Sequence, residues 1–269
     1  MAIVKNPPIE SMTGAFDIKG KNVVVTGGNR GIGLGISTAF AQCGANVAIL
    51  CRNEESGKSV AESFSKYGGR HTCIQVDIAN QSSAAVAAKH VYEFFDRVDV
   101  LVNNAGIGST TNFFAPNGLQ EWHKIINTNL HGVANMVYSI VPGMKESGHG
   151  GTIINISSVG GQRVSNSREH DNSPYNASKA GLDIFTKYLA LTLGDYGIRC
   201  NAIAPGMTHS DLDKDLPPAA FEMAEKTLPT HRFGEPIEIG ALCVFLASPA
   251  GSQITGTIMV HDGGLMTMV

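Results

Sequence analysis

Short runs of aliphatic and β-branched residues recur along the chain, and longer segments with helical periodicity separate them. The runs are NVVVTG, NVAILC, HTCIQVD, VDVLVNNAG, GTIINISS, IRCNAIAPG and GTIMVHDGG. Strands that are apolar on both faces and alternate with helices are typical of a parallel sheet that is covered on both sides. The pattern therefore predicts an α/β fold in which a doubly wound, seven-stranded parallel sheet carries helices on both faces.

Helices are expected between these strands, each ending near a glycine or proline as helix termini tend to. The predicted ranges are Ile32–Cys43, Glu54–Tyr67, Ala84–Phe95, Leu119–Glu146, Tyr175–Tyr196 and Ile237–Ala247. No long linker divides the chain, so residues 21–269 are expected to form a single domain. Residues 1–20 are predicted to be an N-terminal arm, either disordered or packed on a neighbouring subunit. The proline-containing stretch 207–236 interrupts the alternation and is predicted to be a substrate lid.

Composition and charge favour small-molecule partners. The 269 residues carry a net charge of −3, and the charged residues form no long block of one sign, which argues against a nucleic-acid partner. The start of the chain lacks the apolar core of a signal peptide, and no apolar run reaches the ~18 residues that span a membrane, so a cytoplasmic protein without a membrane partner is expected. Five scattered cysteines predict reduced, structural thiols, and the histidines form no metal-binding motif, so no metal is expected.

A glycine-rich loop, within VVVTGGNRGIGLGI, joins the first predicted strand to the first predicted helix. Its glycines stand where the backbone must turn sharply and where a pyrophosphate must come close, and a helix N-terminus favours an anion. This context predicts a dinucleotide site. The loop residues assigned to that site are Gly27, Asn29, Arg30, Gly31, Ile32 and Gly33.

The end of the second predicted strand bears on which dinucleotide is bound. An acidic residue there typically binds the ribose 2′-hydroxyl of NAD. This chain has Cys51 and Arg52 instead, and its next carboxylates, Glu54 and Glu55, come too late. Arg30 and Arg52 offer two guanidinium groups for the extra phosphate of NADP. NADP(H) is therefore the favoured cofactor and NAD the second candidate, while the alternative that both arginines are solvated surface side chains stays open.

In the stretch SPYNASKAG, Tyr175 and Lys179 lie four residues apart near the start of a predicted helix. This spacing places both on one helix face, where an ammonium group near the phenol changes the acidity of the tyrosine. The alternative is the ordinary spacing of an amphipathic helix, which the pair alone does not exclude.

Five motifs, taken in order, decide between these alternatives: TGGNRGIG, NNAG at Asn103–Gly106, INTNLHG around Asn129, NISS at Asn155–Ser158 and YNASK at Tyr175–Lys179. From Lys19 to Gly264 the chain resembles the short-chain dehydrogenase/reductase family, which has a Rossmann-type fold. The resemblance implies Tyr175 as acid/base, Lys179 as its electrostatic and ribose-binding partner, Ser158 as the substrate-orienting hydroxyl and Asn129 as the anchor of a proton-relay water. It also implies cofactor contacts at Asp77, Ile78, Asn104, Ala105, Gly106, Pro205, Gly206 and Ser210.

A family member of this type is an oxidoreductase that interconverts a ketone and a secondary alcohol by hydride transfer. Lys179, together with the positive oxidised nicotinamide, is expected to lower the pKa of Tyr175 toward neutrality. The segment between Ser158 and Tyr175 is longer than is usual in the family, and we expect it to form part of the substrate wall.

The substrate expected from the chain is a sugar-like or polyol ketone, because both ends of the chain look similar to sugar-ketone reductases. Arg163, Arg168, His170 and Asp171 in the lengthened loop suit a hydroxylated substrate. An apolar set, Phe113, Phe114, Phe221 and Met223, favours the alternative of a hydroxysteroid (steroid or bile-acid) dehydrogenase. A 3-oxoacyl-thioester reductase and, outside enzymes, an NADP-sensing binding protein are further alternatives.

A homotetramer is expected by analogy with the family. The helices predicted at Leu119–Glu146 and Tyr175–Tyr196 would form one interface, and the final strand another.

Overall fold

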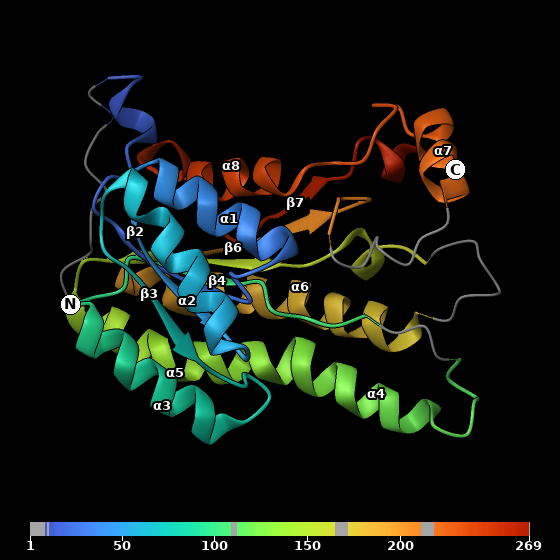
Figure 1. Cartoon of the computed structure of the whole chain (residues 1–269), viewed down its shortest axis with the longest axis horizontal. Helices are drawn as coiled ribbons and strands as arrows, with labels where there is room; N and C mark the ends of the chain where they lie inside the picture. The colour runs from blue at the N-terminus through green and yellow to red at the C-terminus, as the bar shows by residue number, and fades with distance from the viewer. Residues whose placement is uncertain (1–8, 10, 109–111, 165–171, 211–217, 269) are drawn as a thin grey trace.

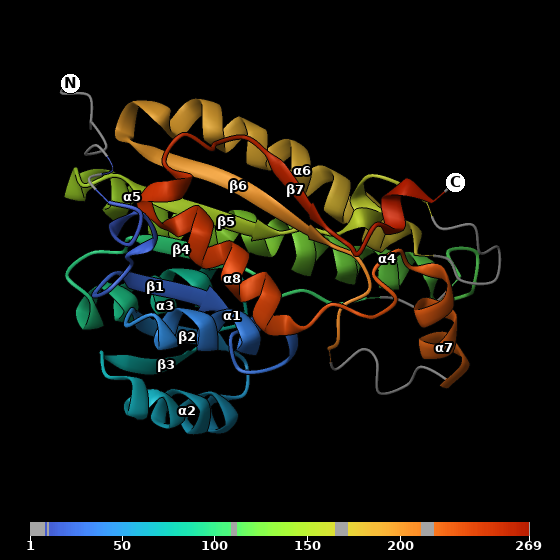
Figure 2. The ribbon, with the colours of Figure 1, turned by 90° about the horizontal axis from the view of Figure 1, so that it is seen from above.

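The computed structural model describes residues 9, 11–108, 112–164, 172–210 and 218–268. Seven parallel strands form one sheet in the order β3-β2-β1-β4-β5-β6-β7, and all of them point toward the end of the molecule that carries α7 (Figure 2). The strands are β1 (Asn22–Thr26), β2 (Asn46–Cys51), β3 (His71–Gln75), β4 (Val100–Asn103), β5 (Gly151–Ile156), β6 (Ile198–Pro205) and β7 (Ile258–His261). The predicted seven-stranded, doubly wound sheet is confirmed.

Helices cover both faces of the sheet (Figure 1). One layer holds α1 (Gly31–Gln42), α2 (Glu54–Ser63) and α8 (Pro236–Ala247); the other holds α3 (Gln81–Phe94), α4 (Gly118–Ile126), α5 (Gly132–Ser147) and α6 (Ser173–Leu193). Because strand side chains alternate between faces, Val23 and Val25 of β1 pack with α1 and α8, and Val24 packs with α3, α5 and α6. This two-sided burial explains why the central strands are apolar throughout.

The helix predicted over Leu119–Glu146 is one helical run with an irregular turn inside it. A π-helical turn, Asn127–His131, joins α4 to α5. It places the Asn129 side chain in full burial. Single π turns inside helices often occur at functional sites, and this one lies beside α6.

The described end of the predicted N-terminal arm packs on its own chain. Ala15 and Ile18 are buried, and the Phe16 ring lies 6.3 Å from that of Phe245 on α8. The Gly20 amide donates to the Gly44 carbonyl at 2.9 Å. Residues 11–20 are therefore part of the domain surface and not a free extension.

The predicted lid stretch contains a helix, α7 (Pro218–Thr227), where we expected irregular structure. Ala224, Leu228 and Phe233 form a small apolar cluster of their own, which Leu265 and Met268 near the C-terminus join. The apolar C-terminal residues Leu265 and Met268 thus pack on the segment around α7 of the same chain. The helical run AAFEMAEKT after Pro218 is the sequence signal for α7.

Two glycines, Gly35 on α1 and Gly240 on α8, allow these helices to cross closely. Gly35 gives a test of this packing. A Cβ added at Gly35 would overlap the Pro236 carbonyl group, so Gly35→Ala is expected to lower the free energy of unfolding by about 1–3 kcal/mol, as overpacking does. Gly194, with nothing near its Cβ position and a helical φ of −57°, is the control: Gly194→Ala should be neutral or stabilising by up to about 1 kcal/mol. Urea unfolding measures both, and equal stabilities for the two variants would contradict the close crossing.

Candidate active site

The predicted site residues gather at the carboxyl edge of the sheet. Most of them end or follow one of the strands β1 to β6 or lie in the first turns of α6, whereas Asn129 lies in the π-helical turn between α4 and α5. The strand order reverses direction at the β1–β4 neighbours, and in open α/β sheets ligands bind in the crevice outside the strand ends at such a point.

Lys179 is held between α6 and the end of β5. Its side chain is 5% exposed, and Nζ donates a hydrogen bond to the Ile156 carbonyl at 2.7 Å. Nζ also lies 5.6 Å from the centre of the Tyr175 ring. The Ser158 side chain is near enough to the Tyr175 hydroxyl to act on its pKa. The structure therefore brings Ser158, Tyr175 and Lys179 together.

Ser158 is positioned by a tight turn that lies on α6. Its backbone is extended, and its hydroxyl accepts a hydrogen bond from the Gly160 amide at 3.1 Å, which caps the 3-10 turn Val159–Gly161. A Cβ at Gly161 would lie 2.9 Å from the Lys179 carbonyl carbon. The glycines after the serine pair thus let this turn approach the helix that carries Tyr175 and Lys179.

Asn129 ties the loop after β4 to the helices. Its amide nitrogen donates to the Ile107 carbonyl at 2.9 Å and to the Ser178 hydroxyl at 3.2 Å, and its oxygen accepts from the Ile107 amide at 2.8 Å. A Cβ at Gly106 would lie 3.3 Å from this oxygen and 3.7 Å from Lys179 Nζ. Gly106 therefore lies between the Asn129 amide and the Lys179 ammonium group, close to both.

Burial dominates the electrostatics of the catalytic candidates. It lowers the pKa of Lys179 from its ordinary value of 10.5 to about 8, although the nearby Asp183 carboxylate acts in the opposite direction. It raises the pKa of Tyr175, and only the Ser158 hydrogen bond opposes the rise. The lowering expected from Lys179 is thus not produced by the protein's own groups, because desolvation of the phenolate outweighs them.

The glycine-rich loop has the geometry that a phosphate cradle requires. Gly27 and Gly31 have φ values of 65° and 49°, and a Cβ at Gly33 would overlap the Gly27 carbonyl oxygen. No side chain caps α1, whereas Asn53 and Asn80 cap α2 and α3. Because the first amides of a helix lack intrahelical acceptors, the start of α1 is suited to an anion.

The adenosine end of this loop carries basic residues. Arg30 and Arg52 are exposed, one at the start of α1 and the other directly after β2. Asn29 links the loop to α2, since its side-chain nitrogen donates to the Ser56 hydroxyl at 2.7 Å. Glu54 forms an ion pair with Lys58 at 2.7 Å. No acidic residue occupies the end of β2, so these residues fit a dinucleotide with a 2′-phosphate.

The remaining cofactor candidates line the same edge. Asn104 donates to the Thr26 carbonyl at 2.9 Å and to the Gly27 carbonyl at 3.3 Å, and the Ala105 amide donates to the Thr26 hydroxyl at 3.1 Å. Asp77 accepts from the Ala79 amide at 3.1 Å within its own turn. Thr26 was not predicted as a site residue. Its sequence signal is that a single polar residue ends the otherwise apolar run VVVT at the edge of the sheet where the site lies.

Three further candidates lie where neighbouring elements meet. Ile78 is buried, and its carbonyl accepts from the Asn135 side chain at 2.9 Å. Pro205 ends β6, and the Gly206 amide donates to the His261 carbonyl at 3.0 Å. Ser210 lies two residues after Thr208, which forms a parallel bridge with Gly234.

Asn155 is a second residue that sequence reasoning left without a role. Its side chain accepts from Asn103 at 2.8 Å and donates to the Thr186 hydroxyl at 2.8 Å. These buried bonds join β4, β5 and α6, the helix that carries Lys179. Asn155 is the first residue of the NISS motif, so the motif could have identified it as a residue of the site.

The described residues among those proposed for substrate recognition make separate sets of contacts. Arg163 donates to the carbonyls of Leu265 and Met268 at 2.8 and 3.2 Å, so it holds the C-terminal turn. Phe113 packs with Phe114 and Trp122, whereas Phe221 packs with His209 and Phe233. Arg168, His170, Asp171 and the side chain of Met223 lie outside the described residues.

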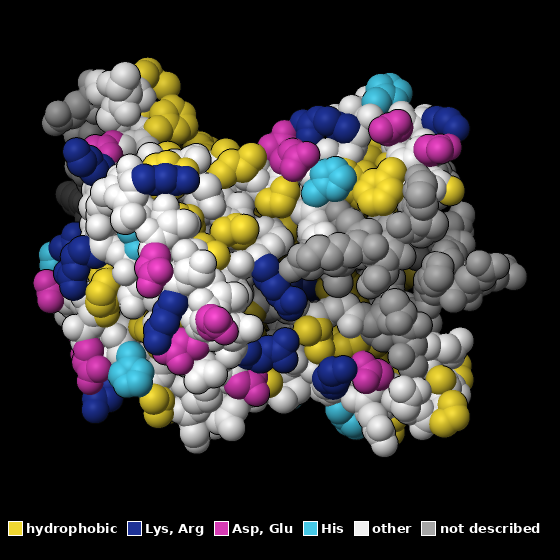
Figure 3. Space-filling view, in the orientation of Figure 1, with side chains coloured by type: hydrophobic (Ala, Val, Ile, Leu, Met, Phe, Trp, Pro, Cys, Tyr) yellow, Lys and Arg dark blue, Asp and Glu magenta, His cyan; other side chains and the backbone are white. Residues whose placement is uncertain are grey.

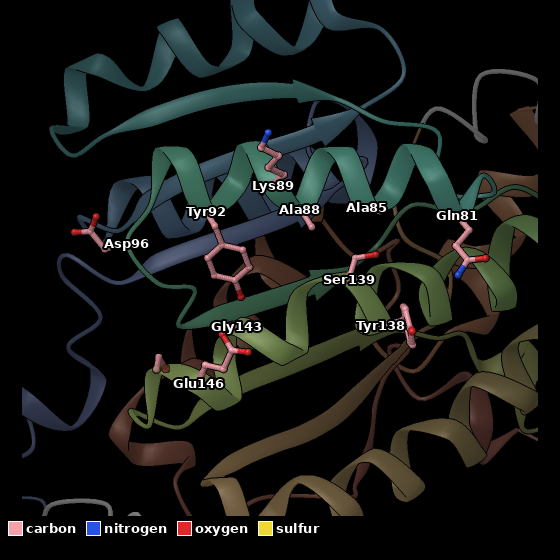
Figure 4. Close-up of a pocket in the computed structure, with 11 residues that line it drawn as sticks. Gln81, Ala85, Ala88, Lys89, Tyr92, Asp96, Tyr138, Ser139, Gly143 and Glu146 are labelled. Carbon is pink, nitrogen blue, oxygen red and sulfur yellow. The ribbon is translucent and has the colours of Figure 1, made fainter.

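A cleft of about 600 Å³ lies between α3 and α5, away from these groups (Figure 4). Tyr92 reaches across it from α3, and its hydroxyl donates to the Ile140 carbonyl at 2.6 Å. Gly143 leaves room for the Tyr92 ring, and burial raises the pKa of that tyrosine to about 12. The cleft is thus a helix-packing feature, with neither Tyr175 nor Lys179 in its wall.

Basic and acidic side chains are intermingled on the face shown in Figure 3. In the part of the chain that the structure describes, no helix combines the length and the apolar character needed to cross a membrane.

Comparison with known proteins agrees with this geometry. A family model described as enoyl-(acyl carrier protein) reductase matches residues 27–266. The chain is 37% identical over 246 residues to a 3-oxoacyl-(acyl-carrier-protein) reductase of Chlamydia muridarum, covering 91% of this chain and 97% of that protein. It is also 37% identical over 254 residues to the L-rhamnose 1-dehydrogenase (NAD(P)(+)) of Azotobacter vinelandii, covering 91% and 96%.

Solved structures superpose closely. A gluconate 5-dehydrogenase from Burkholderia cenocepacia, in complex with NADP and tartrate, matches with a TM-score of 0.87 and 31% identity over 95% of this chain and 99% of that one. A 7α-hydroxysteroid dehydrogenase, complexed with NADH and 7-oxo glycochenodeoxycholic acid, matches with a TM-score of 0.88 and 28% identity over 94% and 96%.

The lowered pKa of Lys179 has a consequence for stability. Between about pH 8 and 10.5 the unfolded chain keeps the lysine proton that the folded protein has lost, so the free energy of unfolding rises with pH in that window. Lys179→Met removes this contribution. We expect the free energy of unfolding of the wild type, relative to Lys179→Met, to rise by an amount on the order of 3 kcal/mol across the window. Urea unfolding at pH 7.5 and 10 measures the difference, and a constant difference would contradict the assignment.

Proposed function

The chain belongs to the short-chain dehydrogenase/reductase family, and from that premise we propose that it is an NADP(H)-dependent enzyme that interconverts a sugar-like or polyol ketone and the secondary alcohol. As a family member it is an oxidoreductase that acts on CH–OH groups with an NAD(P) cofactor. The observation that carries the proposal is the meeting of Ser158, Tyr175 and Lys179 at the sheet edge where the glycine-rich loop leads into α1.

The bound nicotinamide supplies or accepts the hydride. In the proposed mechanism Tyr175 donates its proton to the ketone oxygen as negative charge develops there, and takes it back in the reverse direction. Ser158, whose side chain already acts on the Tyr175 hydroxyl, orients the substrate oxygen. Asn129 anchors the water through which the proton is replaced.

Lys179 and the cofactor's positive charge share the task of making Tyr175 acidic. The protein's own groups raise the pKa of Tyr175 by burial, so the buried ammonium 5.6 Å from the ring is insufficient by itself. We propose that the phenol reaches its working acidity only in the complex with the oxidised cofactor. Such an arrangement couples proton transfer to the presence of the dinucleotide.

The preference for NADP(H) rests on Arg30 and Arg52. Both are exposed beside the glycine loop, and Cys51 stands at the position where a ribose-binding carboxylate would discriminate for NAD. Guanidinium groups bind phosphate with two parallel hydrogen bonds, which suits the 2′-phosphate.

The sugar-like substrate is supported by two relatives whose names refer to sugars or sugar acids, L-rhamnose 1-dehydrogenase and gluconate 5-dehydrogenase. A hydroxysteroid is the second candidate, because Phe114 is 90% exposed and stacks edge-on with Phe113. Initial rates with NADPH against sorbose, 5-ketogluconate, a 3-ketosteroid, a 20-ketosteroid and an acetoacetyl thioester separate these proposals. Selective turnover of a steroid or thioester would replace the sugar assignment, and binding of NADPH without any turnover would favour a sensor.

We further propose a cytoplasmic homotetramer. Tyr138 on α5 and Ile184, Tyr188 and Leu191 on α6 are 60–78% exposed. Exposed apolar side chains of this kind are typical of surfaces that bind another protein, here a second copy of the chain. Sedimentation of the purified protein tests this assembly, and a monomer at micromolar concentration would refute it.

Replacing the tyrosine tests the catalytic assignment. Tyr175→Phe should lower kcat by about 10²–10⁴-fold, the usual contribution of a positioned proton donor, and should leave the Kd for NADPH near that of the wild type. Lys179→Ala should weaken both turnover and cofactor binding. Stopped-flow rates and fluorescence titration measure the two effects, and substantial activity of Tyr175→Phe would rule out its role.

Replacing Arg52 tests the cofactor preference. Arg52→Ala should raise the Kd for NADPH by about tenfold or more, since hydrogen bonds to charged groups contribute about 1.5–3 kcal/mol, and should leave the Kd for NADH unchanged. Lys89→Ala, which removes an exposed charge on α3, is the control. An equal loss for both cofactors would show that Arg52 does not read the 2′-phosphate.

A further inference from the structure

Two cysteines from neighbouring strands meet beneath the adenosine end of the crevice. The Sγ atoms of Cys51, at the end of β2, and Cys73, on β3, lie 3.6 Å apart. In the sheet register Ile49 pairs with Cys73 and Cys51 pairs with Gln75, so the two cysteines are diagonal neighbours on one face of the sheet. We propose that Cys51 and Cys73 form a redox-sensitive thiol pair that a hydroperoxide converts to a disulfide, and that this bond weakens NADP(H) binding by displacing Arg52.

The helix above the pair is built to admit both sulfurs. A Cβ at Gly57 of α2 would overlap the Sγ atoms of Cys51 and Cys73 together, so only glycine leaves room for them. Cys51 Sγ also donates a hydrogen bond to the Asn53 carbonyl at 3.1 Å, at the N-cap of α2. The two thiols are therefore held facing each other by the elements that surround them.

The two sulfurs differ in access and in acidity. Cys51 is only 6% exposed, whereas Cys73 lines a cleft of about 440 Å³ between α2 and β3, together with Lys58, Ala61 and Thr72. The hydrogen bond from Cys73 lowers the pKa of the Cys51 thiol and raises that of Cys73. The thiolate is the nucleophile, so acidity favours Cys51 as the attacking sulfur, whereas access favours Cys73. The disulfide that results is the same in either order.

The oxidation balances with hydrogen peroxide as the oxidant. The thiolate of one cysteine attacks one peroxide oxygen and the O–O bond breaks, which leaves that cysteine as a sulfenic acid and releases one water after protonation. The sulfur of the other cysteine then displaces the sulfenic oxygen, which leaves as a second water with that thiol's proton. One S–S bond forms, both thiols lose their protons, and two electrons reduce the peroxide.

The disulfide acts on Arg52 through the backbone. A disulfide has an S–S length of about 2.05 Å and favours closer Cα atoms than diagonal neighbours usually have, so bridging requires the strands to shift. Arg52 directly follows Cys51, and its carbonyl accepts a hydrogen bond from the Gln75 side chain at 3.0 Å. Drawing Cys51 toward β3 therefore moves the residue assigned to the 2′-phosphate. This second step rests on the proposed NADP(H) preference, but the formation of the disulfide does not.

The test treats the full-length protein with hydrogen peroxide, removes the excess with catalase, and maps the cysteines by alkylation and non-reducing mass spectrometry. We expect a linked pair of peptides containing Cys51 and Cys73, with the KM for NADPH raised several-fold, the KM for NADH unchanged, and both effects reversed by dithiothreitol. Cys73→Ser should abolish the link and the change in KM. Cys43→Ser, which removes an exposed thiol outside the pair, should retain both.

The outcomes separate the two proposals. If Cys51 and Cys73 stay open to alkylation under peroxide that oxidises Cys43, the thiol pair is wrong whatever the cofactor. If the disulfide forms and the KM for NADPH is unchanged, the coupling to Arg52 is wrong. If the untreated enzyme prefers NADH, the proposed cofactor preference fails, and the peptide map still decides whether the thiol pair exists.

Discussion

The position of the Lys179 ammonium group constrains the rest of the candidate active site. A buried charge needs a partner, and Nζ finds it in the Ile156 carbonyl at the carboxyl end of β5. That bond sets α6 at a fixed height above the sheet. Ser158 follows Ile156 by two residues and Tyr175 precedes Lys179 by one helical turn, so both reach the same point once Lys179 is placed. The Asn103, Asn155 and Thr186 hydrogen bonds support this arrangement from below.

The sheet and the motif-bearing parts of the site could be predicted from the sequence because each depends on local pattern. Seven apolar runs separated by helical segments specify a covered parallel sheet, and parallel strands bring their carboxyl ends to one edge. YNASK and the glycine loop then fall at that edge without further information. The hydrogen bond between Asn104 and Thr26 could not be predicted from the sequence, because it joins residues that are 78 positions apart in the chain.

Features that depend on long-range packing escaped sequence reasoning. The π turn at Asn129 has no propensity signal, because it arises from fitting one long helix against both α6 and the loop after β4. The lower pKa predicted for Tyr175 depends on Lys179 and the oxidised nicotinamide together, because the chain's own groups raise this pKa by burial. Helical spacing reports which groups are neighbours; it does not report how much water they have lost. Arg163 was likewise assigned to the substrate from its residue type, but its guanidinium group donates to the Leu265 carbonyl near the C-terminus.

The substrate side of the crevice is built differently from the catalytic side. Tyr175 and Lys179 lie on α6 and Ser158 directly follows β5, and both elements belong to the main core. By contrast, α7 and the C-terminal turn share a separate apolar cluster around Leu228 and Phe233. A segment with its own core can change shape or composition without moving Ser158 or Tyr175. Motifs fixed by the main core therefore identify the reaction class, whereas the segment around α7 carries no motif from which a substrate can be read.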